Sequence, residues 1–261
     1  MRVRPPAVAG QFYPREARAL DAAVRECLPL PATADRLPKA IIVPHAGYEY
    51  SGPVAGSAYT LLRPGREALT RVLLAGPSHR VAFRGVAIPS HASCSTPLGK
   101  VPIDREAVDR LLVLPQVSMM DEAHAGEHGL EVQLPFLQVS LAAFTLVPIV
   151  TGDASAAEVG EVLDAWWGGP ETLVVVSSDL SHYHDSETAR RLDARTSAAI
   201  ESLRGEDITE TDACGAVPIR GLLQVARRRG LRARVLDLRN SGDTGGPRDH
   251  VVGYGAFAFD D

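Results

Sequence analysis

Short apolar, β-branched runs alternate with helical stretches along the 261 residues, and this alternation is the feature that most limits the fold. Several runs are continuously apolar, which is typical of strands covered on both faces. The alternation predicts an α/β protein, an αβα sandwich around a mostly parallel, mixed central sheet. The predicted strands are Ala40–Val43, Val72–Ala75, Gly85–Ile88, Leu146–Val150, Leu173–Ser177, Arg232–Leu238 and Val252–Ala258, the last two being an antiparallel pair.

Helices are predicted between these strands. Asp104 and Asp153 are candidate N-caps, and Gly230 is a candidate C-cap. No internal repeat and no Ser/Gly-rich linker divides the chain, so residues 1–261 are expected to form a single domain. The predicted helices are Ala17–Cys27, Val54–Leu62, Asp104–Leu114, Ala154–Trp167, Ser186–Leu203 and Gly215–Arg229.

Composition excludes several classes of protein. Hydrophobic residues make up 45% and charged residues 23%, the mixture of a globular protein rather than a disordered one. The longest mostly apolar run, Phe136–Val150, is too short to cross a bilayer, and a net charge of −5 without a dense basic run argues against nucleic-acid binding. Cys27, Cys94 and Cys214 lack CxxC spacing, so we expect reduced thiols and a cytoplasmic location.

Histidines follow three of the predicted strands. His45, His79 and His182 each come just beyond the carboxyl end of an apolar run, and Asp243 follows a fourth strand in the same manner. Ligands of open α/β sheets bind at that edge. Imidazoles combined with one carboxylate form the facial triad typical of non-haem Fe(II), and the same residues could hold Zn²⁺ with a bound water.

A structural role is the alternative for each of these residues. A single histidine after a strand is more often a capping or hydrogen-bonding residue than a metal ligand. Asp243 could equally form a salt bridge with Arg239 or Arg248. The repetition of the pattern at successive strand ends is what favours a metal site.

Residues 127–137 are predicted to form a helix that buries leucines and presents His128 and Glu131 on one face. The HExxH motif of metalloproteases is absent because the second histidine is missing. The polar face with His128 and Glu131 could hydrogen-bond neighbouring loops in a purely structural role. Alternatively, His128 or Glu131 could hydrogen-bond a ligand imidazole, as metal sites commonly require.

Cys214 precedes a predicted helix. The helix dipole can lower a thiol pKa there, whereas a buried cysteine behaves as a small apolar residue, and both interpretations stay open. Neither a GxGxxG nor a Walker motif is present, so no nucleotide cofactor is expected.

The chain resembles the Memo family, whose prokaryotic members are called AmmeMemoRadiSam system protein B. The resemblance runs nearly end to end, and its specificity lies in the joint presence and order of its motifs. They are residues 4–14 (RPPAVAGQFYP), 44–52 (PHAGYEYSG), 76–79 (GPSH), 96–99 (TPLG), 127–136 (EHGLEVQLPF), 177–182 (SSDLSH), 213–215 (ACG), 240–243 (NSGD) and 251–254 (VVGY).

The resemblance implies a fold similar to class III extradiol ring-cleavage dioxygenases, which are non-haem iron enzymes. It places metal ligands at His45 and His79. The third ligand is a cysteine in animal members, and Asp243 occupies that place here. A thiolate favours Cu(I), whereas a carboxylate favours Fe(II), Mn(II) or Zn(II), so the resemblance implies Fe(II) first and makes copper less expected.

The resemblance also implies roles around the metal. His182 matches the acid/base histidine of the dioxygenases, and Asp179 precedes it in the same loop and would orient it. Residues expected beside the ligands or in the substrate cleft are Tyr48, Ser78, His128, Glu131 and Cys214.

Three functions follow as hypotheses. The first is an Fe(II)-dependent oxidoreductase of the dioxygenase type with His182 as general base. The second is a Zn²⁺ hydrolase that uses a metal-bound water. The third is a non-catalytic protein whose cleft binds a peptide, or a radical-SAM partner that the name of the prokaryotic group implies.

Overall fold

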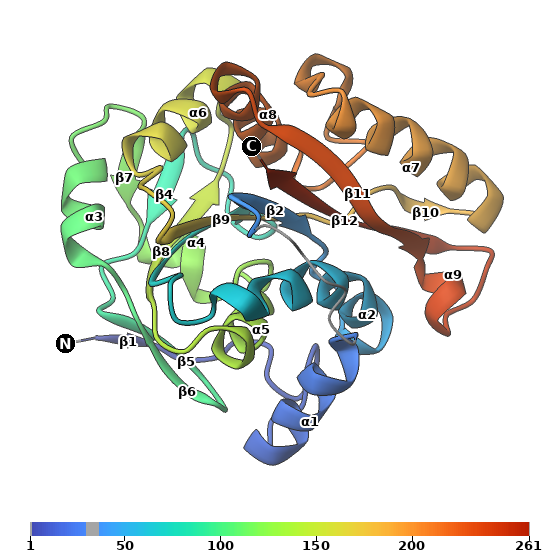
Figure 1. The fold of residues 1–261 in the computed structure, drawn as a ribbon, viewed down its shortest axis with the longest axis horizontal. Coiled ribbons are helices and arrows are strands. Elements are labelled where there is room, and N and C mark those ends of the chain that lie inside the picture. Colours follow the sequence, from blue (N-terminus) through green and yellow to red (C-terminus); the bar gives the residue numbers. More distant parts are fainter. Residues whose placement is uncertain (1, 30–36, 261) are drawn as a thin grey trace.

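A large mixed sheet forms the centre of the computed structural model, which describes residues 2–29 and 37–260 (Figure 1). Within these residues the sheet has nine strands in the order β10-β12-β2-β9-β3-β8-β4-β7, with β11 also paired to β12. The strands are β2 (Ala40–Val43), β3 (Arg71–Pro77), β4 (Val86–Ile88), β7 (Val117–Met119), β8 (Thr145–Thr151), β9 (Thr172–Ser177), β10 (His182–His184), β11 (Arg232–Asn240) and β12 (Val251–Asp260).

The middle of the sheet is parallel, and this places the candidate site. Strands β2, β9, β3 and β8 run in one direction, so the residues that follow β2, β9 and β3 emerge at the same edge. Every residue of β2 and β9 is buried, as their continuous apolar sequences predict. The antiparallel pairing of β11 with β12 is confirmed.

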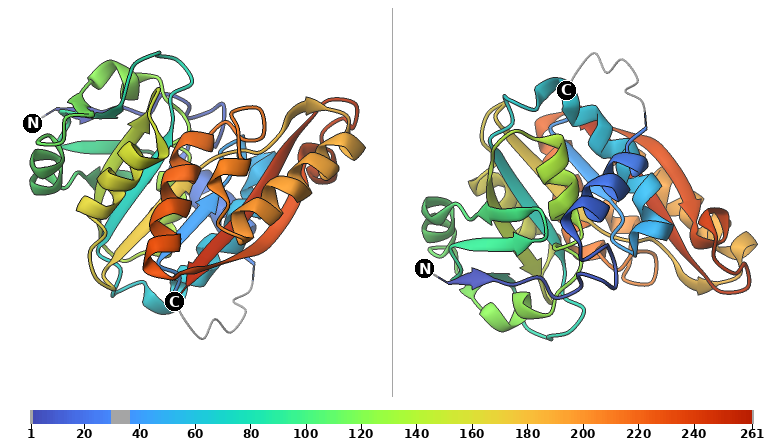
Figure 2. Two further views of the ribbon diagram at one scale, coloured as in Figure 1. Left: turned by 90° about the horizontal axis from the view of Figure 1, so that it is seen from above. Right: turned by 90° about the horizontal axis from the view of Figure 1, so that it is seen from below.

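Helices cover both faces of the sheet, which confirms the predicted layers (Figure 2). The first layer packs α1 (Ala17–Cys27), α2 (Tyr48–Tyr59) and α5 (Gln133–Ser140) together, and the opposite layer holds α6 (Ala156–Ala165), α7 (Ser186–Glu201) and α8 (Ala216–Arg229). No helix in the described part of the chain combines the length and apolar character needed to cross a bilayer.

The remaining elements are short. A separate small sheet consists of β1 (Val3–Arg4), β5 (Ser93–Thr96) and β6 (Gly99–Pro102). The short helices are η1 (Thr60–Gly65), α3 (Arg105–Leu111), α4 (Asp121–Ala125), η2 (Gly205–Asp207) and α9 (Ser241–Thr244). The sequence patterns did not reveal β1, β5, β6, β7 or β10, since these short strands lack the continuous apolar run that marked β2 and β4.

Helix caps agree with the sequence at two positions and differ at a third. The Asp104 side chain accepts from the Ala107 N–H, and Gly230 ends α8 in the left-handed region at φ 75°. Asp153 does not cap α6, because its backbone pairs with the residues before β4; Ser155 caps that helix.

The predicted helix over residues 127–137 is wrong in its first half. Helix α5 begins only at Gln133, residues 129–132 form turns, and residues 127–128 have no regular secondary structure. The Glu127 carboxylate accepts the Gly129 N–H at 2.7 Å, a local side-chain bond that competes with helical hydrogen bonding. His128 and Glu131 therefore do not share a helix face.

Candidate metal centre

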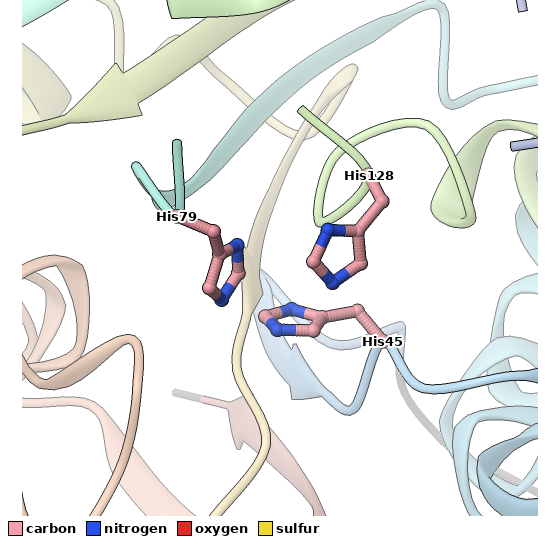
Figure 3. Close-up of side chains that lie close together, drawn as sticks. All are labelled: His45, His79 and His128. Atoms are coloured by element: carbon pink, nitrogen blue, oxygen red, sulfur yellow. The ribbon is translucent and has the colours of Figure 1, made fainter. Parts of the chain in front are cut away.

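Three imidazole rings meet at the carboxyl edge of the parallel strands (Figure 3). His45 follows β2, His79 follows β3, and His128 lies in the loop between α4 and α5. One ligand atom from each ring lies within 4.8 Å of the others. The ring centroids of His79 and His128 are 4.5 Å apart, and those of His45 and His79 are 5.1 Å apart.

A buried hydrogen-bond network fixes the tautomer of His45. The Gln133 side-chain amide donates to the Pro44 carbonyl at 2.9 Å and to the Ser177 hydroxyl oxygen at 2.8 Å. The Ser177 hydroxyl donates to the Gly129 carbonyl at 2.5 Å. Its proton is thus committed, so the 2.9 Å contact with His45 requires that Nδ1 carry the proton and donate. The lone pair of His45 is therefore on Nε2.

A carboxylate fixes the tautomer of His79 in the same way. Nδ1 of His79 donates to Glu127 Oε1 at 2.8 Å, and the His79 backbone N–H donates to Oε2 at 2.8 Å. Burial alone would raise the pKa of Glu127, but the hydrogen bonds from His79 lower it to about 2. Glu127 is thus an anion that leaves Nε2 of His79 free for a metal, the arrangement common for metal-binding histidines.

The imidazoles of His45 and His128 are neutral at physiological pH. Burial, and secondarily the charge of His79, lower the pKa of His45 to about 3. Burial and the neighbouring imidazoles lower the pKa of His128 to about 4. A metal ligand must offer an unprotonated nitrogen, so the donor set fits a divalent transition metal without a prior loss of protons. Imidazole ligands suit zinc, copper, iron and nickel.

A cleft of about 350 Å³ opens beside the cluster. His128, Asp179 and His182 all line it. The Leu180 carbonyl accepts from Nδ1 of His182 at 2.7 Å, which leaves Nε2 of His182 as a proton acceptor. The Asp179 carboxylate accepts a hydrogen bond from the His45 backbone N–H at 2.7 Å. Burial raises the pKa of the Asp179 carboxyl. A backbone carbonyl thus orients His182, and the orienting role of Asp179 stays a prediction.

Asp243 lies in helix α9 and makes local contacts. One carboxylate oxygen accepts the Asn240 N–H at 3.1 Å, and the other pairs with Arg190. The sequence suggested Arg239 or Arg248 as the salt-bridge partner of Asp243, and the structure has Arg190 instead. A salt bridge is nonetheless the structural role that was the alternative to metal binding. The group of three ligand atoms contains His128 and not Asp243. The assignment of Asp243 as a ligand stays a prediction.

Glu131 holds the N-terminal segment rather than an imidazole. Its carboxylate accepts from the Tyr13 hydroxyl at 2.6 Å and from the backbone N–H groups of Ala7 and Val8, and it pairs with Arg4 at 2.6 Å. Glu127, four residues earlier, makes the bond to a ligand imidazole. The sequence offered one signal for this, since Glu127 stands directly before His128.

Two other expected residues lie at neighbouring cavities. The Tyr48 hydroxyl donates to the Val132 carbonyl at 2.6 Å, and Tyr48 lines a cavity of about 520 Å³ together with Phe12. Ser78 donates to the Val81 carbonyl at 2.6 Å and lines a cavity of about 370 Å³. Their roles toward a substrate stay predictions.

Cys214 contacts the cluster directly. Its sulfur lies 3.3 Å from Nε2 of His45. Burial, and secondarily the charge of Asp179, raise the pKa of the thiol to about 12. The metal-free cysteine is therefore a thiol at neutral pH, which supports the buried role over that of an activated nucleophile.

Comparisons with known proteins agree on one family. A sequence model of the family described as Memo-like protein matches residues 4–258. A MEMO1 family protein of Aquifex aeolicus is 36% identical over 270 residues, which cover 99% of this chain and 100% of that protein. A MEMO1 family protein of Archaeoglobus fulgidus is 38% identical over 269 residues, which cover 98% and 99%.

A solved structure shares the fold. It is the crystal structure of the uncharacterized protein JW3007 from Escherichia coli K12, with a TM-score of 0.52 and 15% sequence identity. The match covers 84% of this chain and 99% of that chain. At this identity the similarity concerns the fold alone.

Proposed function

Because the chain belongs to the Memo-like protein family, we propose that it is a metal-dependent oxidoreductase acting on a small organic molecule in the cleft beside His128. The observation that carries the proposal is the convergence of three imidazoles, with Nε2 of His45 and of His79 opposite the Nδ1 atoms that Ser177 and Glu127 engage. Such a preformed donor set is the main requirement for a metal centre.

Fe(II) is the proposed metal, with Mn(II) or Zn(II) as alternatives. The choice rests on the resemblance of the motifs to non-haem iron dioxygenases, because imidazoles alone accept several metals. A metal in this position would supply Lewis-acid or redox activation of a small molecule bound in the cleft.

The chain itself would supply proton transfer and orientation. His182 lines the same cleft as His128, and its Nε2, which is not the nitrogen bonded to the Leu180 carbonyl, would accept a proton from a bound substrate. Asp179 would act on the ligand side, since its carboxylate fixes the backbone of His45. Aromatic side chains of Phe12 and Tyr254 line the cleft and would exclude water from a bound molecule.

A zinc hydrolase is the second candidate. Three histidines are the ligand set of a known class of catalytic zinc site, which keeps its fourth position for water. The inclusion of His128 in place of a carboxylate is the observation that favours this candidate. If no metal binds, we propose instead that the chain binds a peptide or a partner protein without turnover. A radical-SAM protein is one such partner.

Anaerobic metal titration tests the proposal. We expect the wild-type protein to bind about one Fe(II), and His79→Ala and His128→Ala to lose most of the affinity because each removes one donor. Asp243→Ala is the matched variant, and it is expected to keep the affinity since its carboxylate engages Arg190. Full iron occupancy in His79→Ala would refute the site.

The same series separates the two assignments of the third ligand. A loss of binding in Asp243→Ala with binding kept in His128→Ala would return that role to the carboxylate. Full occupancy by Zn²⁺ in preference to Fe(II), together with turnover of ester or amide substrates, would favour the hydrolase.

A further inference from the structure

Tyr183 lines the cleft beside the histidine cluster, in a backbone conformation that tyrosine rarely adopts. Its φ angle is 62°, and the residue is 75% exposed. We propose that Tyr183 is a ligand-binding residue whose ring covers an uncharged, apolar small molecule in this cleft. This inference rests on the cleft assigned above as the substrate site, and it names a contact residue and a class of ligand for that site.

The first support is the backbone conformation. Among the described residues, Tyr183 and Leu203 are the non-glycine residues with a positive φ. Leu203 directly follows the C-cap of α7, where the left-handed region commonly ends a helix. Tyr183 lies instead in strand β10, at the edge of the large sheet (Figure 1). Steric clashes make this region unfavourable for a bulky side chain, and residues that are held in it cluster at ligand sites.

The second support is a β-bulge at Tyr183. Strand β10 pairs with β12 through His182–Val252 and His184–Val251, and the register shifts between these two pairs, so Tyr183 is the additional residue. Neighbouring residues of a regular strand point to opposite faces, yet His182 and Tyr183 both line the cleft, with ring centroids 5.6 Å apart. A molecule that gives its proton to His182 would therefore also meet the ring of Tyr183.

The third support is the exposure of the ring. A tyrosine that served only the fold would bury its ring, as Tyr59 and Tyr254 do. Tyr183 leaves most of its surface open to solvent, so packing within the chain does not offset its unfavourable backbone conformation. Contact with a ligand would remove ring surface from water, which is favourable.

The lining of the cleft defines the class of ligand. The side chains of Phe12, Tyr50 and Tyr254 line it together with Tyr183. No lysine or arginine of the described chain lines it. A phosphate or carboxylate would therefore find no permanently charged partner there, whereas an apolar body can pack on the rings.

Titration with benzyl alcohol, followed by NMR, tests the contact in the full-length protein after chelation of bound metal. The wild type, Tyr183→Phe and the control Val113→Asn should bind equally, since Tyr183→Phe keeps the ring and Val113 is an exposed apolar residue outside the cleft. Tyr183→Asn should bind about two- to tenfold more weakly, the effect of one lost aromatic contact. Nuclear Overhauser contacts should join benzyl alcohol to the Tyr183 ring in the wild type, and the anionic benzoate should bind more weakly.

Thermal unfolding separates a ligand contact from a structural role. Asparagine adopts the left-handed region more readily than tyrosine does, so Tyr183→Asn should unfold at the temperature of the wild type or above it. A midpoint several degrees lower would assign the ring to the stability of the fold and overturn the proposal.

The binding results decide the matter independently of the metal. Unchanged affinity in Tyr183→Asn, no binding of benzyl alcohol by the wild type, or tighter binding of benzoate each overturns the role of Tyr183 and leaves the histidine site intact. Failure of the wild type to bind Fe(II) or Zn²⁺ overturns the metal site and leaves the Tyr183 contact intact. The absence of nuclear Overhauser contacts in the wild type overturns the proposal even if Tyr183→Asn does not fold.

Discussion

Arg4 joins the N-terminal segment to the loop that carries His128, through an ion pair and hydrogen bonds. The variant Arg4→Met tests how much these contacts contribute to the free energy of unfolding. Arg4 is 4% exposed, and its guanidinium pairs with the Glu131 carboxylate at 2.6 Å. It also donates to the backbone carbonyls of His124 and Glu127, each at 2.7 Å. All three acceptors lie on one short stretch of chain far away in sequence.

The size of the effect follows from what Arg4→Met leaves behind. Methionine keeps much of the volume, but the Glu131 carboxylate, 1% exposed, loses its cation. Removing one partner of a buried ion pair costs about 3–5 kcal/mol. The Tyr13 hydroxyl and two backbone N–H groups still bind the carboxylate, so we expect a loss at the lower end of that range.

Urea denaturation followed by circular dichroism measures the loss. Arg25→Met is the matched control, because Arg25 pairs with Asp21 on the exposed face of α1, with side chains 60% and 41% exposed. Exposed helix pairs of this kind contribute about 0.3–0.5 kcal/mol. Glu131→Gln added to Arg4→Met should recover part of the loss, because it removes the unpaired buried charge.

A stabilising role of the buried Arg4–Glu131 pair is refuted if Arg4→Met lowers the free energy of unfolding by no more than Arg25→Met does. Such a result would mean that the buried pair only offsets its own desolvation and that the N-terminal segment is held by apolar packing.

Three further predictions concern the site and the core. Glu127→Gln should weaken Fe(II) or Zn²⁺ binding about 10–100-fold by titration calorimetry, because the amide no longer supplies the charge that holds His79; unchanged affinity would contradict this role. Burial lowers the pKa of His124 to about 4, so its contribution to stability is complete above the unfolded value of about 6.5 and is lost as pH falls toward 4. The urea midpoint of the metal-free protein should fall over that window, and less steeply in His124→Gln; equal slopes would rule out this assignment. Gly56→Ala should lower the midpoint of thermal unfolding by several degrees, because its Cβ would lie 1.9 Å from the Cys27 carbonyl oxygen where α1 packs on α2. An unchanged midpoint would show that the two helices can separate without cost.

Local sequence determined the framework of the fold. Continuous apolar runs such as Ala40–Val43 and Leu173–Ser177 can be covered only in a central strand, so their place in the sheet could be read from the residues. Two of the clustered histidines could be predicted for the same reason. His45 and His79 follow parallel strands, and the carboxyl ends of parallel strands share one edge.

The third histidine depends on contacts that no local pattern contains. His128 reaches the cluster because its segment is turned rather than helical, with Glu127 bonded to His79 and Glu131 to the N-terminal residues. These bonds join positions 48 and 118 residues apart. Strand order likewise decided the surroundings of Asp243, since β11 is antiparallel and leads into a short helix beside Arg190.

Sequence alone therefore determined the layers, the parallel strands and the edge at which ligands converge, because each follows from the polarity of neighbouring residues. Only the tertiary structure decided which side chains complete the cluster and which tautomers they hold. Those properties depend on the hydrogen-bond partners that distant segments bring to each imidazole, as Ser177 and Gln133 do for His45.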